Sequence, residues 1–217
     1  MSRNMLRYRL VLRQRLYDTD LYRVKGQISM ENEVTPKDKV FQTAARLFYQ
    51  HGYRAVGVDT IVAESGVGKM TLYRHYPSKD DLIVAYLRES NDAFWDYFEQ
   101  STEDALTPRD ELLAFFRGLQ NYVTDPACYG CPFLNVATEY PETDYSGHQV
   151  ALEHKQSVRT RFRQLAEAAG AAKPEALADQ LFLLMDGAYV ASRMFDTENP
   201  AAHVAEAARV LVDAALG

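Results

Sequence analysis

The chain has 217 residues, 47% of them hydrophobic, and a formal net charge of −6. This is enough to bury a core and to form one large or two small domains. No apolar run reaches the roughly 18 residues of a membrane span, and Leu10-Val11-Leu12 is too short for the core of a secretory signal. With two cysteines and no signal, we expect a reducing cytoplasm.

Basic residues are concentrated toward the N-terminus. Residues 1–33 and 34–80 each carry a formal charge of +3, whereas residues 81–217 carry −12. This asymmetry is typical of a nucleic-acid-binding module joined to a domain that polyanions avoid. Solubilising charge is the alternative, but it does not explain where the sign changes.

The first 33 residues show no sustained helix or strand period, and they contain several arginines before any acidic residue. We interpret residues 1–33 as a disordered extension or an upstream-extended start. A basic arm that follows the DNA backbone or enters the minor groove is the functional alternative. The composition also permits an organelle-targeting peptide.

From Thr35 onward the pattern predicts an all-α fold, because strand signals are almost absent. Thr35-Pro36 predicts the start of a helix that ends at His51-Gly52. Ser78 predicts the start of a long helix that continues through Phe98. Later helices are expected over 108–124, 132–139, 147–169, 174–195 and 200–216.

Between the first and the long helix, Val58 to Lys79 predicts two short helices joined by a turn at Gly66. Several hydrogen-bond donors follow the turn: Lys69, Thr71, Tyr73, Arg74, His75 and Lys79. Such donors bind DNA phosphates and base edges from a helix in the major groove. Gly68-Lys69 is not a nucleotide-binding loop, because Ala63 and Met70 stand where that motif requires glycine and Ser or Thr.

From Thr35 to about Asp81 the chain resembles, without a gap, the N-terminal DNA-binding domain of the TetR family of bacterial transcriptional repressors. The matching residues are Ala44, Ala45, Leu47, Phe48, Gly52, Tyr53, Ile61, Ala63, Gly66, Val67, Thr71, Leu72, Tyr73, His75, Ser78, Lys79 and Leu82. The chain departs from the family at Gly57, where a Ser or Thr cap is usual, and at Met70, where a small residue is usual. We expect Met70 to change which bases are read.

The resemblance divides the chain into residues 34–80, a helix-turn-helix DNA-binding domain of three helices, and residues 81–217, a helical ligand-binding and dimerisation domain. It also implies contacts with DNA by Lys69, Met70, Thr71, Tyr73, His75 and Lys79. Lys69 and Met70 are placed to meet bases. Thr71, Tyr73 and Lys79 are placed to hold phosphates, and His75 is placed to do either.

The second part is rich in aromatic residues with interspersed polar groups, a composition that permits a ligand cavity but is also that of a core. The resemblance favours a cavity for a small apolar or amphipathic effector. The candidate lining residues are Trp95, Phe98, Phe116, Phe133, Asn135, Glu139 and Tyr189.

The last two expected helices are apolar over a wide arc and rich in alanine, which suits packing on two sides. One side would form the chain's own core. The other would form a homodimer interface, which the resemblance favours, and a monomer core is the alternative. The candidate interface residues are Leu184, Ala188, Ala191, Val204, Ala208 and Leu211.

Cys128 and Cys131 are separated by two residues, and Cys131 precedes an expected helix. The pair can form a redox disulfide or, with His148 and His154, part of a metal site. The resemblance instead implies that Cys131 shapes the cavity wall. We expect no cofactor and no resident metal. Since known catalytic motifs are absent, we expect no enzyme.

The residue patterns and the resemblance together predict a dimeric repressor that binds a palindromic operator, with recognition helices roughly 34 Å apart. A small molecule is expected to release it from DNA by shifting the long helix. A thiol-based redox or metal-sensing regulator is the alternative function, and an all-helical enzyme or cofactor carrier is the alternative from another class.

Overall fold

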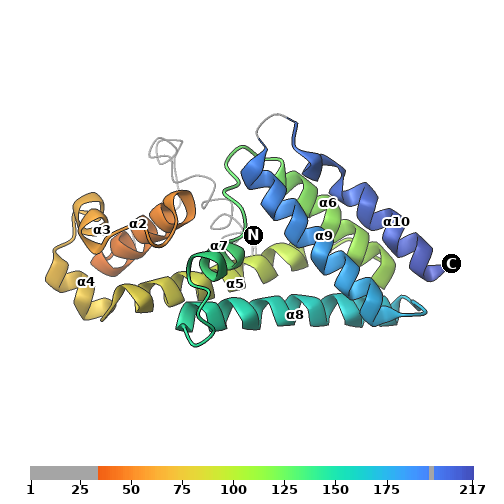
Figure 1. Ribbon diagram of the computed structural model, residues 1–217, viewed down its shortest axis with the longest axis horizontal. Coiled ribbons are helices and arrows are strands. Elements are labelled where there is room, and N and C mark those ends of the chain that lie inside the picture. Colours follow the sequence, from red (N-terminus) through yellow and green to blue (C-terminus); the bar gives the residue numbers. More distant parts are fainter. Residues whose placement is uncertain (1–33, 196–197) are drawn as a thin grey trace, which may run out of the picture.

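The computed structural model describes residues 34–195 and 198–217, and all regular structure in these ranges is helical (Figure 1). This confirms the all-α prediction. The predictions made for residues 1–33 lie outside the described residues. In the described ranges, no helix is both long enough and apolar enough to cross a membrane.

The described part of the chain begins with three short helices: α2 (Pro36–His51), α3 (Val58–Ser65) and α4 (Lys69–His75). Helix α2 starts where the sequence predicts, because Thr35 and Asp38 form a reciprocal capping box and Pro36 occupies the first turn. It ends at Gly52, whose φ of 87° is open to glycine and costly for other residues. Local signals therefore fix both ends of α2.

A long helix, α5, runs from this module into the group of C-terminal helices (Figure 1). The Ser78 hydroxyl accepts a hydrogen bond from the Asp81 amide and caps its first turn. The boundary expected between residues 80 and 81 lies in that turn, so one continuous helix belongs to both parts of the chain. The helices from α5 onward are α5 (Lys79–Ser101), α6 (Pro108–Val123), α7 (Pro132–Glu139), α8 (Ser146–Ala168), α9 (Pro174–Met194) and α10 (Val204–Leu216).

The last helix differs from the expectation of one helix over 200–216. Residues Pro200–His203 form a 3-10 helix, η2, before α10 begins at Val204. The Asn199 side chain accepts from the Ala201 amide and favours the tighter turn at this start. The other expected helix ends from residue 108 to residue 195 agree with the structure to within one residue.

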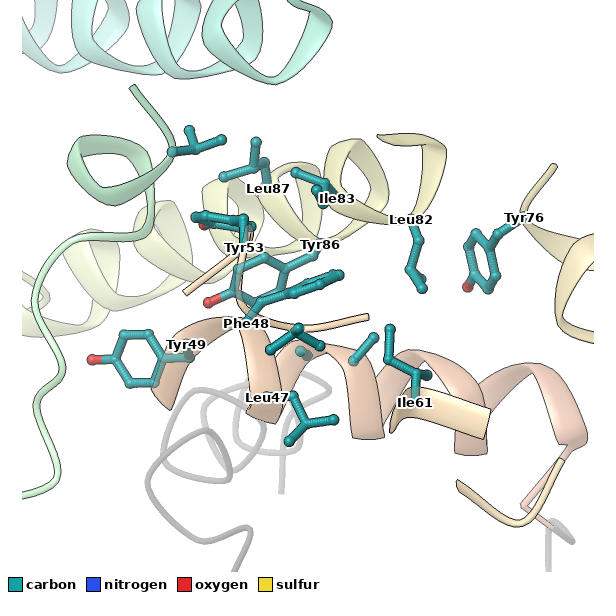
Figure 2. Packing of buried hydrophobic residues seen from close by; sticks show 14 of the residues in the cluster. Leu47, Phe48, Tyr49, Tyr53, Ile61, Tyr76, Leu82, Ile83, Tyr86 and Leu87 are labelled. Atoms are coloured by element: carbon teal, nitrogen blue, oxygen red, sulfur yellow. The ribbon is translucent and has the colours of Figure 1, made fainter. Parts of the chain in front are cut away.

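Two hydrophobic clusters stabilise the fold. The first joins α2, α3 and α4 to the N-terminal half of α5 and to α7, and Phe48, Tyr53 and Tyr86 pack at its centre (Figure 2). Their ring centroids lie 5.5–6.1 Å apart, within the range of favourable aromatic pairs. The second cluster lies among the end of α5, α6, α8, α9 and α10. Helix α7 therefore packs with the N-terminal module, although it comes from the later part of the chain.

Candidate functional site

Helix α4 is held in place by its buried side. Leu72 is fully buried together with Ile61 of α3, and Val67 of the turn joins the same cluster. Gly66 ends α3 in the left-handed region, with φ 66° and ψ 14°, which costs other residues about 1–2 kcal/mol. The expected glycine turn is confirmed, and it sets α4 against α2 and α3.

The opposite side of α4 is open to solvent. Lys69, Met70, Tyr73 and His75 are exposed, Met70 by 84% and Tyr73 by 40%. A buried Tyr76 closes the module, so the Tyr73 ring is not needed for that purpose. The exposed side of α4 thus presents donors and one large apolar side chain together.

The remaining predicted contact residues are partly buried. Thr71 lies within α4 and Lys79 opens α5. Arg74 is a further exposed donor that the predicted contact set omits, and its guanidinium lies 3.4 Å from the Thr71 hydroxyl. In the sequence, the positive charge of Arg74 was the signal that could have added it to the predicted contacts.

The charges on this surface are already engaged in part. Lys69 Nζ donates to Asp59 Oδ1 at 2.7 Å, and this hydrogen bond raises the pKa of Lys69. Burial lowers the pKa of Lys79, against the opposing effect of Asp80. Asp59 therefore competes with any anion for Lys69. Lys79 is positioned by its place in the first turn of α5.

A small hollow of about 50 Å³ lies among α5, α6, α7, α8 and α9. It is lined by Ser90, Ala93, Phe94, Tyr97, Tyr122, Cys131, Pro132, Phe133, His154, Lys155, Met185 and Tyr189. Of the expected lining residues, Phe133 and Tyr189 lie here. Trp95, Phe98 and Phe116 instead pack into the second cluster, because their rings are taken up by neighbouring core side chains.

His154 and Lys155 are the titratable side chains in this wall. Burial lowers the pKa of His154 to about 3, so the imidazole is neutral; it stacks on Phe133 at 3.6 Å and its Nδ1 bonds Asn91 Oδ1 at 2.9 Å. Burial disfavours the Lys155 ammonium, but Cys131 and its ion-pair partner Asp186 outweigh this and raise its pKa. The wall of the hollow is therefore mainly aromatic. It also contains the neutral imidazole of His154 and the ammonium of Lys155, which is paired with Asp186.

A larger hollow of about 290 Å³ lies between α7 and α9. It is lined by Cys131, Leu134, Asn135, Thr138, Glu139, Tyr189, Val190, Arg193 and Met194. The expected residues Asn135 and Glu139 lie here rather than in the small hollow. The Asn135 amide donates to the Tyr129 carbonyl at 3.2 Å, and Arg193 donates to the same oxygen at 2.7 Å.

Helix α9 and the η2–α10 segment form an apolar surface groove that contains four of the expected dimer residues: Leu184, Ala188, Ala191 and Val204. Ala208 is already fully buried within the protomer, and Leu211 is partly buried. Several large apolar side chains that the prediction missed are exposed on the same helices: Leu183, Val190, Met194 and Val210. Helical periodicity marks both sides of such a helix as apolar and does not tell which side the protomer itself covers.

The two thiols are free and buried, and they contact different partners. Cys128 Sγ lies 3.4 Å from the Ser192 hydroxyl, whereas the Cys131 thiol makes no capping bond to α7 and hydrogen-bonds Lys155. Of the two histidines considered as further metal ligands, His148 bonds the Tyr140 carbonyl and His154 bonds Asn91. Among the described residues, no group of three or more potential ligands is assembled for a metal ion.

Comparisons with known proteins agree with this architecture. Residues 40–86 match the family model for bacterial regulatory proteins of the tetR family, and residues 108–208 match a tetracyclin repressor-like C-terminal domain. Two solved structures are similar over most of the chain. The TetR-family regulator SCO4454 from Streptomyces coelicolor has a TM-score of 0.80 and 29% identity, covering 84% of this chain and 96% of that one. A putative TetR regulator from Streptomyces avermitilis has a TM-score of 0.74 and 30% identity, covering 83% and 98%.

Curated relatives match over a shorter stretch. The uncharacterized HTH-type transcriptional regulator YxaF of Bacillus subtilis is 30% identical over 82 residues, which is 37% of this chain and 43% of that protein. The HTH-type transcriptional repressor KstR2 of Mycolicibacterium smegmatis is 29% identical over 80 residues, 37% of this chain and 39% of that protein. The chain thus spans less than half the length of these curated relatives. With both family models matched in order and whole-chain structural similarity to family members, the chain belongs to the TetR family of transcriptional regulators, which are not enzymes.

Proposed function

We propose that this regulator is a homodimeric repressor that works in the cytoplasm, binds a palindromic operator and is released by a small molecule. The exposed side of α4 is the observation that carries the proposal. It presents Lys69, Met70 and Tyr73 outward while Leu72 anchors the helix from behind. A short helix with outward donors on a rigid support is the arrangement that enters a major groove.

Within that interface we assign two kinds of contact. Lys69 and Met70, at the start of α4, meet base edges, and the Met70 side chain is long and apolar enough to pack on a thymine methyl group. Thr71, Tyr73 and Lys79 hold phosphates and set the register, and His75 does either. When DNA binds, Lys69 exchanges its Asp59 partner for the operator, so Asp59 tunes its availability.

The experiment is salt-dependent binding to operator DNA obtained by sequencing the fragments that the purified protein selects. Lys79→Ala should reduce the slope of log affinity against log salt by about two per dimer, since each bound phosphate contributes roughly 0.9. Lys173→Ala, an exposed lysine before α9, is the matched control and should leave the slope unchanged. The assignment is contradicted if Lys79→Ala leaves the slope unchanged. It is also contradicted if salt does not weaken binding of the selected DNA.

The dimer is supported by the apolar surface of α9 and α10. Leu183 is 68% exposed there, and it lines a groove formed almost entirely by apolar side chains. Two such surfaces bury each other about a two-fold axis, which also sets two recognition helices at successive major grooves. Leu183→Asp should shift the protein to monomer in sedimentation velocity, whereas Leu106→Asp, at a 93% exposed position elsewhere, should not. A wild-type monomer that still binds a palindrome tightly would refute the dimer.

A further inference from the structure

Two side chains border both hollows. The described residues that line both the small hollow and the larger one are Cys131 and Tyr189. Cys131 comes from the start of α7, and Tyr189 comes from α9. The two hollows are therefore neighbours, and their shared border includes one thiol and one phenol ring.

Their sizes indicate that they work together. The small hollow, at about 50 Å³, holds only a few atoms. The larger one, at about 290 Å³, is open and close to the lower end of the roughly 300–1,000 Å³ of ligand pockets. Joined through a rotation of the Tyr189 ring, the two reach the size of a ligand site.

The chemistry of the two parts is complementary. Aromatic rings surround the inner part, among them Phe94, Tyr122 and Phe133. The outer part adds polar side chains, namely Asn135, Thr138, Glu139 and Arg193. A molecule with a flat aromatic end and a hydrogen-bonding end matches both parts at once.

The outer part also contains the contact that ties α7 to the DNA-binding module. Glu139 Oε1 accepts from the Tyr53 amide at 3.0 Å, and Oε2 accepts from the Arg54 amide at 2.6 Å. The chain passes very close here, because a Cβ on Gly52 would lie 2.7 Å from Oε1. A second bond joins the ends of the same two elements, since the Tyr53 hydroxyl donates to the Pro132 carbonyl at 2.9 Å. Figure 1 shows α7 between the three short helices and the C-terminal helices.

We propose that the two hollows form one effector site for an amphipathic aromatic molecule, and that occupancy of the outer part releases the Glu139 contact with the Tyr53 and Arg54 amides. This inference rests on the proposed ligand response and names its site and route. The route runs through α7, directly to the end of α2, in addition to the long helix α5. Glu139 is a positioning residue in this scheme: it holds the DNA-binding module and does not touch DNA.

The site is tested with the fluorescent probe 1-anilinonaphthalene-8-sulfonate, which has an aromatic body and a polar end. Ala93→Leu fills the inner part and Thr138→Trp fills the outer part. Each should weaken probe affinity by about tenfold, a change of one decade in Kd. Thr160→Trp is the matched control, because Thr160 and Thr138 are both exposed and both donate to the carbonyl four residues earlier. It should change Kd by less than about twofold.

If only one of the two filling variants weakens binding, the hollows are separate and the proposal fails. If neither does, the probe sits elsewhere, for example on the apolar groove of α9 and α10, and the proposal fails as well. Thr138 is exposed, so its variant folds even if Ala93→Leu does not. These measurements contain no DNA and are therefore independent of operator binding.

The route is tested by hydrogen exchange of the DNA-free protein. Saturating probe should speed exchange of the Tyr53 and Arg54 amides by at least about fivefold, since both lose their acceptor. The buried middle of α6 should not respond. In Glu139→Ala the two amides should exchange fast without probe and show no further change. Bound probe with unchanged exchange at these amides overturns the proposed route.

Discussion

The buried histidine beside the small hollow makes a sharp prediction about stability and pH. Burial lowers the pKa of His154 to about 3, whereas in the unfolded chain this pKa lies near its ordinary value of 6.5. The unfolded state therefore takes up a proton that the folded state refuses, and stability falls as the pH drops below 6.5. At pH 5 the unfolded pKa lies 1.5 units above the pH, and at about 1.4 kcal/mol per unit the loss is about 2 kcal/mol relative to pH 7.

The size of this loss in stability does not depend on how far burial lowers the pKa of His154 in the folded state. As long as the folded pKa lies below about 4, the folded state is unprotonated at pH 5 and only the unfolded value enters. His154→Phe keeps a flat ring for the stack on Phe133 and removes the titration. We expect the free energy of unfolding in urea to fall between pH 7 and pH 5 by about 2 kcal/mol more in the wild type than in the variant.

Equal losses between pH 7 and pH 5 in the wild type and in His154→Phe would refute the reasoning, since the acid sensitivity would then come from other groups.

Three further substitutions test the packing. Gly52→Ala and Gly66→Ala both place a side chain at positive φ, but only at Gly52 does the new Cβ meet another group, Glu139 Oε1 at 2.7 Å. We expect thermal unfolding to show about 1–2 kcal/mol lost at Gly66 and clearly more at Gly52. Phe162→Ala, at a fully buried ring, should cost about 3–5 kcal/mol in urea unfolding, and a smaller cost would mean that the second cluster collapses around the cavity.

The helix ends were predictable because their signals are local. Thr35 and Ser78 cap helices through bonds to amides three residues later, and Pro36, Pro108 and Pro132 occupy first turns. Such contacts form within one turn and need no distant partner. The exception was the start of the last helix, where the Asn199 side chain and Pro200 favour a 3-10 turn over an α-turn.

The candidate cavity was predictable only in part. Aromatic density is the same signal for a core ring and for a ring that faces a hollow, so Phe98 and Phe116 could not be separated from Phe133 and Tyr189. The sequence pattern marked His154 only as a candidate metal ligand and did not mark Lys155. Each faces the hollow because of its place on α8 relative to α7 and α9.

The amino-acid sequence by itself determined the helices, the turn at Gly66, the separation of basic and acidic parts, and the family, since these depend on neighbouring residues and on motif spacing. Tertiary structure alone decided which side of α9 stays exposed, which rings line the hollows, and that Glu139 holds the module that carries α4. The Glu139 bonds join residues 86 and 85 positions apart, and no periodicity or spacing encodes a contact over such a distance.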